Sequence, residues 1–546
     1  MPAAAPWFRY VILLGLGGIH ALGFSPDPLP GWSLPFVQLV CLAFLFWHVF
    51  ASPSTGRAAW RGFAFGLGFF IVGLYWIFIS LHTYGGLAAP LAVASVVVLA
   101  AGMALYLTLA CAVSYRLTAD ALHRITGMGG QILIASVWAS SFALAEWLRG
   151  TLFTGLPWLN IGYAHVDGFL AGWAPIFGVY GMAWLAAFIS AAIALLARAQ
   201  GSPNDTPAAT AVATGIVLAL AGMALSYINW SRPHGQPTLV RLAQGNIPQS
   251  EKFDPALMQQ GIETYMQLAA LPAKQEGATP SIIVLPETIM TLFQDSYAPQ
   301  VWDQWRWIAT RQNATILMGA PLHGIVDGQD RFTNSAIAFN GDTPLDQLLS
   351  GTPDMHYDKH HLVPFGEFIP TGFRWFVDAI AIPLGDFNRG SKRQSLFQLD
   401  GQVIAPNICY EDVFGEEIIQ SVRASEQHGP GATMLVNLSN LGWFGNSWAL
   451  SQHLQISRMR SLETARPMLR ATNTGMTAAI DPDGAVRAVL PPHIKGVLDV
   501  EVQGTEGLTP YVRWGNTPVL ILSVLLLGLG FYRVRRPTCT QQKNGA

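Results

Sequence analysis

Charged residues are scarce in this chain, since only 12% of its 546 residues are charged while 51% are hydrophobic. Soluble proteins carry roughly 25% charged residues, so much of the chain must face lipid or a very large core. The deficit is uneven, because residues 1–235 hold very few acids or lysines and residues 236–505 have an ordinary globular composition. The net charge of −2 gives no reason to expect a nucleic-acid partner.

Cysteine is nearly absent as well, with four in the whole chain. Cys41 and Cys111 lie in apolar runs and Cys539 lies in the polar tail, so Cys409 is the one cysteine of the polar part. No disulfide framework is readable from this spacing. A metal site is not readable either, because nothing at ligand spacing completes a tetrahedral set around the histidines at 356, 360 and 361. We expect no metal and no cofactor.

Long apolar runs are abundant. A spanning helix needs roughly 20 mostly apolar residues, and candidate spans lie at about 8–24, 32–50, 63–81, 88–113, 131–148, 178–197, 208–228 and 515–532. The first run is not a cleaved signal peptide, because it continues into further spans. We predict a membrane domain of about seven helices over 1–235, a catalytic domain over 236–505, and a last membrane helix with a tail over 506–546.

The basic residues of the short loops predict the orientation of these spans. Arg149 is the one exception to a pattern in which the basic residues fall on the same side of the membrane. The residues on that side are Arg9, Arg57, Arg61, Arg116, Arg124, Arg198, Arg533, Arg535, Arg536 and Lys543. Both termini are then cytoplasmic and residues 236–505 lie on the far side. In a bacterium that side of the inner membrane is the periplasm.

The polar part alternates β-like and helical stretches, which is typical of an α/β domain. Expected strands are 239–243, 281–285, 314–318, 336–339, 403–408, 433–437 and 476–480, and expected helices are 255–272, 298–312, 413–426 and 447–466. Residues 481–484, Asp-Pro-Asp-Gly, indicate a hairpin turn. Catalytic groups of such folds cluster where strands end, and Glu287 and Cys409 each follow an expected strand.

Several motifs of the polar part resemble the carbon–nitrogen hydrolase (nitrilase) superfamily: Gln-Gly-Asn-Ile-Pro-Gln at 244–249, Leu-Pro-Glu-Thr at 285–288, Lys-His-His-Leu-Val-Pro-Phe-Gly-Glu at 359–367, Ile-Cys-Tyr-Glu at 408–411 and Asn-Leu-Ser-Asn at 437–440. The motifs at 73–77 and 157–163 make the whole chain similar to the apolipoprotein N-acyltransferase family. One departure is visible, since Leu441 and Gly442 stand where the family often has Asp-Ala. The resemblance implies a polytopic α-helical membrane bundle plus a nitrilase-like αββα sandwich.

The resemblance also implies a Glu-Lys-Cys triad of Glu287, Lys359 and Cys409. Since a thiol with a pKa of about 8.5 is mostly protonated at neutral pH, Glu287 would act as general base. Lys359 and the backbone N–H after Cys409 would face the developing oxyanion. Glu367 would orient Lys359 and Glu287 through hydrogen bonds, and Tyr410 and Glu411 would shape the thiol pocket. Further supporting residues are Asn334, Trp443 and Arg470.

The implied activity is a two-step transfer. A phospholipid would acylate Cys409, and the α-amino group of a diacylglyceryl-cysteine apolipoprotein would then accept the chain. Water must be excluded from the thioester, and a lid over 370–395 is a candidate. We expect a monomer. Phe253, Phe387, Trp443, Phe444 and Trp448 either line a passage for acyl chains or are core aromatics.

Two other functions compete with this one. A membrane-tethered nitrilase-type amidase would use the same triad with water as second nucleophile, although one tether would suffice for it. A non-enzymatic receptor or transporter with a degenerate nitrilase-like domain would not need the intact Glu287, Lys359 and Cys409 set.

Overall fold

The structure is a computed structural model that describes residues 7–24, 29–122, 127–273, 278–372, 374, 386–425 and 429–535. The chain divides into two compact units. One comprises Met1–Tyr75, Ala94–Ile228 and Trp514–Ala546, and the other comprises Trp76–Val93 and Asn229–Arg513. Residues 76–93 thus pack with the second unit, although the sequence does not separate them from the membrane part. The boundaries at 235 and 505 stay predictions.

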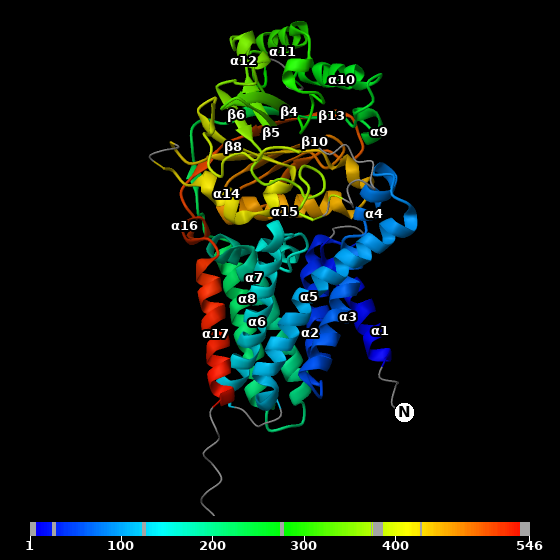
Figure 1. The fold of residues 1–546 in the computed structure, drawn as a ribbon. Helices are drawn as coiled ribbons and strands as arrows, with labels where there is room; N and C mark the ends of the chain where they lie inside the picture. Colours follow the sequence, from blue (N-terminus) through cyan, green and yellow to red (C-terminus); the bar gives the residue numbers. More distant parts are fainter. Residues whose placement is uncertain are drawn as a thin grey trace, which may run out of the picture. The chain divides into compact units, whose positions relative to one another are not determined.

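Long apolar helices make up the first unit (Figure 1). They are α1 Phe8–Ala21, α2 Leu34–Phe50, α3 Thr55–Gly73, α5 Ala89–Leu122 (which begins in the second unit), α6 Met128–Thr151, α7 Ala174–Ala199, α8 Asp205–Leu225 and α17 Thr517–Arg535. Among the described residues, five helices are long and apolar enough to cross a membrane, or six if one bent pair counts as a span. Phe8–Phe24 and Thr517–Arg533 are shorter apolar helices. The expected membrane bundle is confirmed. The sequence predicted eight spans, whereas five or six of the described helices are long and apolar enough to cross a membrane.

The predicted span 63–81 is broken. Helix α3 ends at Gly73, and α4 Ile77–Ile79 with the π-helical turn η3 Ser80–Tyr84 continues at a bend of 57°. Trp76 accounts for the break, because its indole donates to Gln452 Oε1 at 3.1 Å and its ring packs on Phe444 at 4.5 Å. These contacts tie the segment after the bend to the second unit.

Arg149, the exception in the charge pattern, is buried at the end of α6. Its guanidinium lies 2.5 Å from Glu146 Oε2 and donates to the carbonyl oxygens of Leu156 and Trp158. Arg149 therefore holds the loop after α6 in place. Because the charge is paired and buried, it does not count as a loop charge in the orientation argument.

Two six-stranded sheets form the second unit. One has the order β13-β2-β3-β4-β5-β6 and the other β12-β11-β10-β9-β8-β7. The first is built from β2 Thr238–Gln244, β3 Ile282–Val284, β4 Thr315–Val326, β5 Gln329–Phe339, β6 Met355–Asp358 and β13 Gly496–Val502. The second is built from β7 Phe397–Leu399, β8 Gln402–Ile408, β9 Met434–Ser439, β10 Met468–Thr472, β11 Ala478–Ile480 and β12 Val486–Val489. A short pair, β1 Arg232–Pro233 and β14 Thr505–Glu506, stands apart.

The two sheets share one apolar core, in which Leu242 and Val284 of one sheet meet Ile404 and Val436 of the other. Helices α10 Met258–Ala270 and α11 Pro299–Gln312 cover one outer face. Helices α14 Gly415–Val422 and α15 Trp448–Thr464 cover the other, as Figure 1 shows. The predicted αββα sandwich is confirmed.

The hairpin expected at 481–484 is also present. Strands β11 and β12 pair antiparallel across it. The Asp481 N–H donates to the Ala485 carbonyl at 2.8 Å, and the Gly484 N–H donates to the Asp481 carbonyl at 2.9 Å. Within each sheet, β2-β3-β4 and β8-β9-β10 are parallel. The carboxyl ends of these strands therefore meet at one edge, which is where the polar site forms.

Candidate active site

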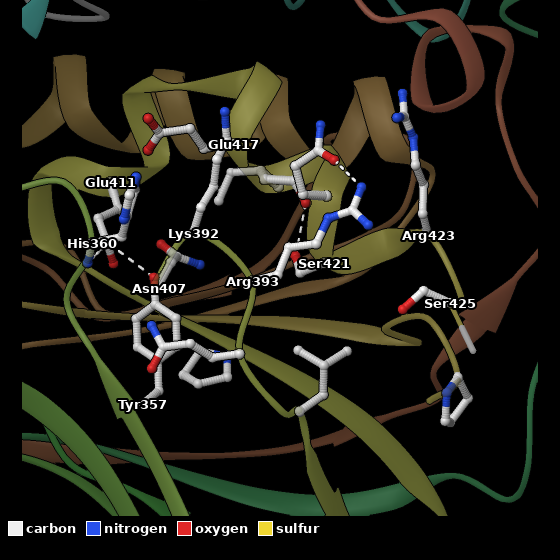
Figure 2. Close-up of a pocket in the computed structure, with 16 residues that line it drawn as sticks. Tyr357, His360, Lys392, Arg393, Asn407, Glu411, Glu417, Ser421, Arg423 and Ser425 are labelled. Atoms are coloured by element: carbon white, nitrogen blue, oxygen red, sulfur yellow. Dashed lines mark hydrogen bonds between the residues drawn. The ribbon is translucent and has the colours of Figure 1, made fainter. Parts of the chain in front are cut away.

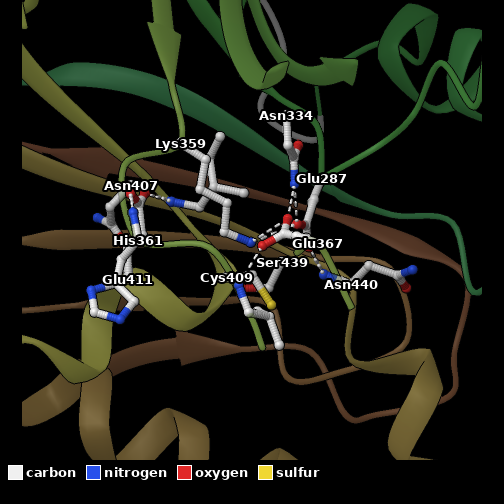
Figure 3. Close-up of polar contacts among 12 residues, drawn as sticks. Glu287, Asn334, Lys359, His361, Glu367, Asn407, Cys409, Glu411, Ser439 and Asn440 are labelled. Atoms are coloured by element: carbon white, nitrogen blue, oxygen red, sulfur yellow. Dashed lines mark hydrogen bonds and ion pairs between the residues drawn. The ribbon is translucent and has the colours of Figure 1, made fainter. Parts of the chain in front are cut away.

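The three residues of the expected triad follow three strands. Glu287 comes shortly after β3, Lys359 directly follows β6, and Cys409 directly follows β8 and opens the 3₁₀ turn η8 Cys409–Val413. Glu287 and Lys359 come from one sheet and Cys409 from the other. Figure 3 shows their side chains directed toward one small region together with Glu367. The sandwich thus brings together residues that are far apart in the sequence.

One ammonium group lies between two carboxylates at the centre of the site. Lys359 Nζ donates to Glu287 Oε1 at 3.3 Å and to Glu367 Oε1 at 2.9 Å. Asn334, in β5, donates from Nδ2 to the same two oxygens at 2.9 and 2.6 Å. The other oxygen of Glu287 accepts from the backbone N–H of Asn440 at 3.0 Å. Because all these side chains are buried, the hydrogen bonds hold the Glu287 carboxylate in one position.

These contacts decide where the protons lie. Burial opposes ionisation of Glu287, but the Lys359 charge and the Asn334 hydrogen bond outweigh it, so the pKa of Glu287 is below its usual value. Burial likewise opposes the Lys359 charge, and the carboxylates of Glu367 and Glu287 raise the pKa of Lys359 well above its usual value. Burial and then the Glu287 charge raise the pKa of the Cys409 thiol, against the charge of Lys359. At neutral pH the site holds a carboxylate, an ammonium and a protonated thiol.

The backbone at Cys409 is unusual. Its φ of 52° is left-handed, which costs an L-residue roughly 1–2 kcal/mol, so the surrounding contacts must hold it. Its carbonyl oxygen accepts from Asn437 Nδ2 and from His453 Nε2, both at 3.2 Å. The sharp turn after β8 thus directs the half-buried thiol into the site.

Glu411 links the loop of Lys359 to the turn of Cys409. Its Oε1 accepts from the Tyr357 hydroxyl at 2.9 Å and from the backbone N–H groups of His360 and His361 at 2.7 and 3.1 Å. Its Oε2 accepts from the Ile408 N–H at 2.7 Å. Glu411 therefore holds the backbone segments next to Lys359 and Cys409 in position.

Three other expected supporting residues lie further from the carboxylates. The Tyr410 ring packs edge-on against His361 at 5.9 Å and Phe414 at 5.2 Å. Trp443, in η9 Leu441–Phe444, stacks on Phe253 at 6.1 Å and meets Tyr84 edge-on at 5.9 Å. Arg470, in β10, is fully buried and donates to His453 and Ser457.

Known proteins resemble this chain along nearly its full length. The apolipoprotein N-acyltransferase N-terminal domain model matches residues 16–192, and the carbon–nitrogen hydrolase model matches residues 239–511. An apolipoprotein N-acyltransferase from Bordetella bronchiseptica is 51% identical, over 97% of this chain and 98% of its own. Another from Ralstonia nicotianae is 42% identical, over 98% of this chain and 95% of its own. The chain belongs to the apolipoprotein N-acyltransferase family.

Membership makes the chain an N-acyltransferase within the carbon–nitrogen hydrolase superfamily. Among solved structures, a protein of that superfamily from Xanthomonas campestris is 18% identical, with a TM-score of 0.36 over 49% of this chain and 91% of its own.

This N-acyltransferase has a second buried lysine at the site, which was not predicted from the sequence. Lys252, which ends α9 Gln249–Lys252, donates from Nζ to the Glu287 carbonyl at 3.1 Å. Burial lowers the pKa of Lys252 to about 8, against the charges of Glu287 and Cys409. Its place just after the 244–249 motif was the available signal. Asn440 ends the 437–440 motif and Asp412 directly follows the 408–411 motif, yet neither was assigned a role, and no local pattern marks His453.

The histidines at 356, 360 and 361 have their own partners. The Nδ1 atoms of His356 and His360 lie 2.9 and 2.8 Å from the carbonyls of Pro353 and Gly390, and His361 Nδ1 lies 3.1 Å from Glu417 Oε1. Among the described residues no group of three or more His, Cys, Asp or Glu is arranged to hold a metal ion.

Residues 373 and 375–385 of the expected lid, with Gly385 among them, lie outside the described residues. The part that follows is tied to the site. The Phe387 N–H donates to the Glu367 carbonyl at 3.0 Å, and the Gly390 N–H donates to the Lys359 carbonyl at 2.9 Å. Two residues near the end of the expected lid, Phe387 and Gly390, are therefore bonded directly to the backbone of Glu367 and Lys359.

A pocket that is open to solvent is lined in part by Glu411 (Figure 2). Tyr357, His360 and Glu411 line one end, and Lys392 and Arg393 line another part. The lining includes none of the three triad residues. This pocket is therefore distinct from the space around the thiol.

Proposed function

We propose that the protein transfers a fatty acyl chain from a phospholipid, through a thioester on Cys409, to the α-amino group of a diacylglyceryl-cysteine apolipoprotein. The observation that carries the proposal is the buried arrangement in which Lys359 joins Glu287 and Glu367 beside the Cys409 thiol. Family membership supports the substrate class, and the apolar helices of the first unit support a substrate that arrives within a membrane.

The first half-reaction forms the thioester. Glu287 takes the thiol proton as Cys409 Sγ attacks the ester carbonyl of the phospholipid. Lys359 Nζ and the Tyr410 N–H stabilise the oxyanion. The intermediate then collapses, the ester C–O bond breaks, and the proton on Glu287 passes to the departing lysophospholipid oxygen. Because the thiol is protonated at rest, proton transfer accompanies the attack.

The second half-reaction consumes the thioester. The α-amino group attacks the thioester carbonyl and gives a proton to Glu287. Collapse breaks the C–S bond and forms the amide, and the proton on Glu287 returns to the sulfur of Cys409. Water would give a free fatty acid at this step, so the outcome depends on keeping the site dry. The catalytic domain is proposed to act at the periplasmic face of a bacterial inner membrane.

Intact-mass analysis of the purified protein with phospholipid tests the first step. We expect a hydroxylamine-labile gain of one acyl chain in the wild type and none in Cys409→Ser. Glu287→Gln keeps the shape and removes the base, so adduct formation should slow by about 10²–10⁴-fold. The matched control is Glu263→Gln on the exposed side of α10, which should react at the wild-type rate.

The contrary result is equally clear. If the wild type gains no acyl mass while its thiol still reacts with an alkylating probe, the phospholipid donor is wrong. Release of ammonia from a small amide would then support the amidase. If an acyl adduct forms but releases only free fatty acid when a diacylglyceryl peptide is added, the acceptor is wrong.

A further inference from the structure

A second group of buried polar residues contacts the main chain of Cys409. Asp412 belongs to η8, His453 and Ser457 belong to α15, and Arg470 belongs to β10. All four side chains are fully buried. They come from three elements, and one of them, His453, contacts the carbonyl of Cys409 together with Asn437 of β9. We call these four residues the His453 cluster.

Hydrogen bonds in the cluster determine the protonation of His453. Arg470 Nη2 lies 3.0 Å from His453 Nδ1. A guanidinium can only donate, so Nδ1 must carry the lone pair and Nε2 must carry the hydrogen. That hydrogen faces two acceptors, Asp412 Oδ1 at 2.7 Å and the Cys409 carbonyl at 3.2 Å. The ring is therefore neutral and donates toward the main chain of the nucleophile.

The rest of the cluster fixes the position of the ring. Arg470 Nη1 donates to Ser457 Oγ at 2.5 Å, and the Ser457 hydroxyl donates to Asp412 Oδ2 at 2.5 Å. Arg470 also lies 3.6 Å from Asp412 Oδ2, so one cation offsets one anion. A buried ion pair is weak evidence for stability on its own. What this one achieves is a single orientation of the His453 ring.

The contact with Cys409 matters because of peptide geometry. In a trans peptide the C=O and the N–H point in opposite directions. Asn437 and His453 bind the Cys409 carbonyl from one side, and so the N–H of Tyr410 is directed to the opposite side. That N–H is the proposed oxyanion donor. The left-handed φ of Cys409 means that this peptide would relax to another orientation without the two donors.

We propose that His453 is a positioning residue, which orients the Cys409–Tyr410 peptide so that its N–H faces the oxyanion of the acyl transfer. The role of Arg470 is to fix the His453 tautomer. This inference rests on the proposed function, because it concerns the thioester-forming step. It assigns no contact between His453 and the substrate.

Two reactions of the same thiol separate this role from a structural one. Acylation by phospholipid passes through an oxyanion, whereas alkylation by iodoacetamide displaces iodide at a saturated carbon and forms none. In His453→Leu, acylation of Cys409 should slow by about 10–10³-fold, as for the loss of an oxyanion donor. The rate of Cys409 alkylation should stay within about threefold of the wild-type rate, because this reaction depends on the thiolate and not on an oxyanion donor. Peptide mass spectrometry confirms that Cys409 is the alkylated residue.

Further variants keep the test decisive. His453→Gln retains an amide donor and should restore most of the acylation rate. His356→Leu, an exposed histidine on β6, should match the wild type in both reactions. If His453→Leu does not fold, as judged by its melting temperature, Asn437→Asp removes the other donor to the same carbonyl and should show the same split.

Other outcomes overturn the inference. Equal losses of acylation and alkylation would mean that the cluster acts on the thiol or the fold, and an unchanged acylation rate would mean that it does not act. The proposed function fails separately, because in that case the wild type itself forms no acyl adduct.

Discussion

Glu287 and Glu367 share one cation, and that arrangement explains how a carboxylate can stay ionised in a buried site. Two buried carboxylates repel, and such a pair usually retains a proton. Here Lys359 and the Asn334 amide contact both carboxylates, and Lys252 adds a second positive charge behind Glu287. The base is therefore ionised before substrate binds.

The lowered pKa of Lys252 predicts that the alkylation rate of Cys409 depends on this lysine in a pH-dependent way. Because the pKa of Lys252 is lowered to about 8, it is charged below that pH and neutral above it, while its hydrogen bond to Glu287 persists. The charge favours the thiolate of Cys409. Lys252→Met should therefore slow iodoacetamide alkylation about three- to tenfold at pH 7, on the scale of up to one pKa unit. The deficit should shrink as the pH rises past 8.

The measurement is the ratio of wild-type to variant alkylation rates between about pH 6 and about pH 10, a range that lies on both sides of the Lys252 pKa of about 8. Lys495→Met removes an exposed lysine and should give a flat ratio near one. A Lys252→Met ratio that does not change with pH would mean that its charge does not act on the thiol.

At the scale of elements, the site depends on how two loops are joined. The loop after β6 carries Lys359 and the turn after β8 carries Cys409, and Glu411 accepts hydrogen bonds from both. The loops belong to different sheets, so this one carboxylate sets their spacing. Packing of the two sheets brings the two loops close together, and the hydrogen bonds to Glu411 fix the distance between them.

Glu411→Ala should lower the free energy of unfolding of the second unit by at least about 3 kcal/mol. The reason is that it leaves several buried N–H groups without an acceptor, at about 1–3 kcal/mol each. Tyr357→Phe removes one of the four donors and should cost about 1 kcal/mol. Thermal unfolding in detergent measures both. Equal effects of the two variants would contradict the linking role.

At the scale of the whole molecule, the distribution of basic residues predicts which segments of the chain lie on each side of the membrane. The basic residues of the short loops predict that both termini are cytoplasmic and that the second unit lies on the far side. The buried ion pair of Arg149 removes the one exception to that pattern. Orientation stays a prediction of the sequence.

Cysteine labelling checks the orientation. In a Cys409→Ser, Cys539→Ser background, Lys495→Cys should react with a membrane-impermeant maleimide in intact spheroplasts. Ala51→Cys, at an exposed position in the turn between α2 and α3, should react only after permeabilisation. The reverse pattern would invert the predicted topology.

The sequence by itself determined the class of the protein, the order of its apolar helices, the alternation of strands and helices, and the three residues proposed as a triad. Those features are legible because they depend on composition, on local periodicity and on motifs of a few adjacent residues. It did not reveal the break after Gly73, which follows from Trp76 binding Gln452 far along the chain.

Only the tertiary structure revealed that Lys252 and His453 contact the backbone of the proposed triad residues. Lys252 lies 35 residues before Glu287, and His453 lies 44 residues after Cys409. Lys252 comes just after the 244–249 motif, but the local sequence of His453 looks like an ordinary helix face. Their contacts exist because two sheets pack face to face and bring the ends of distant strands to one edge, and that packing is a property of the whole chain.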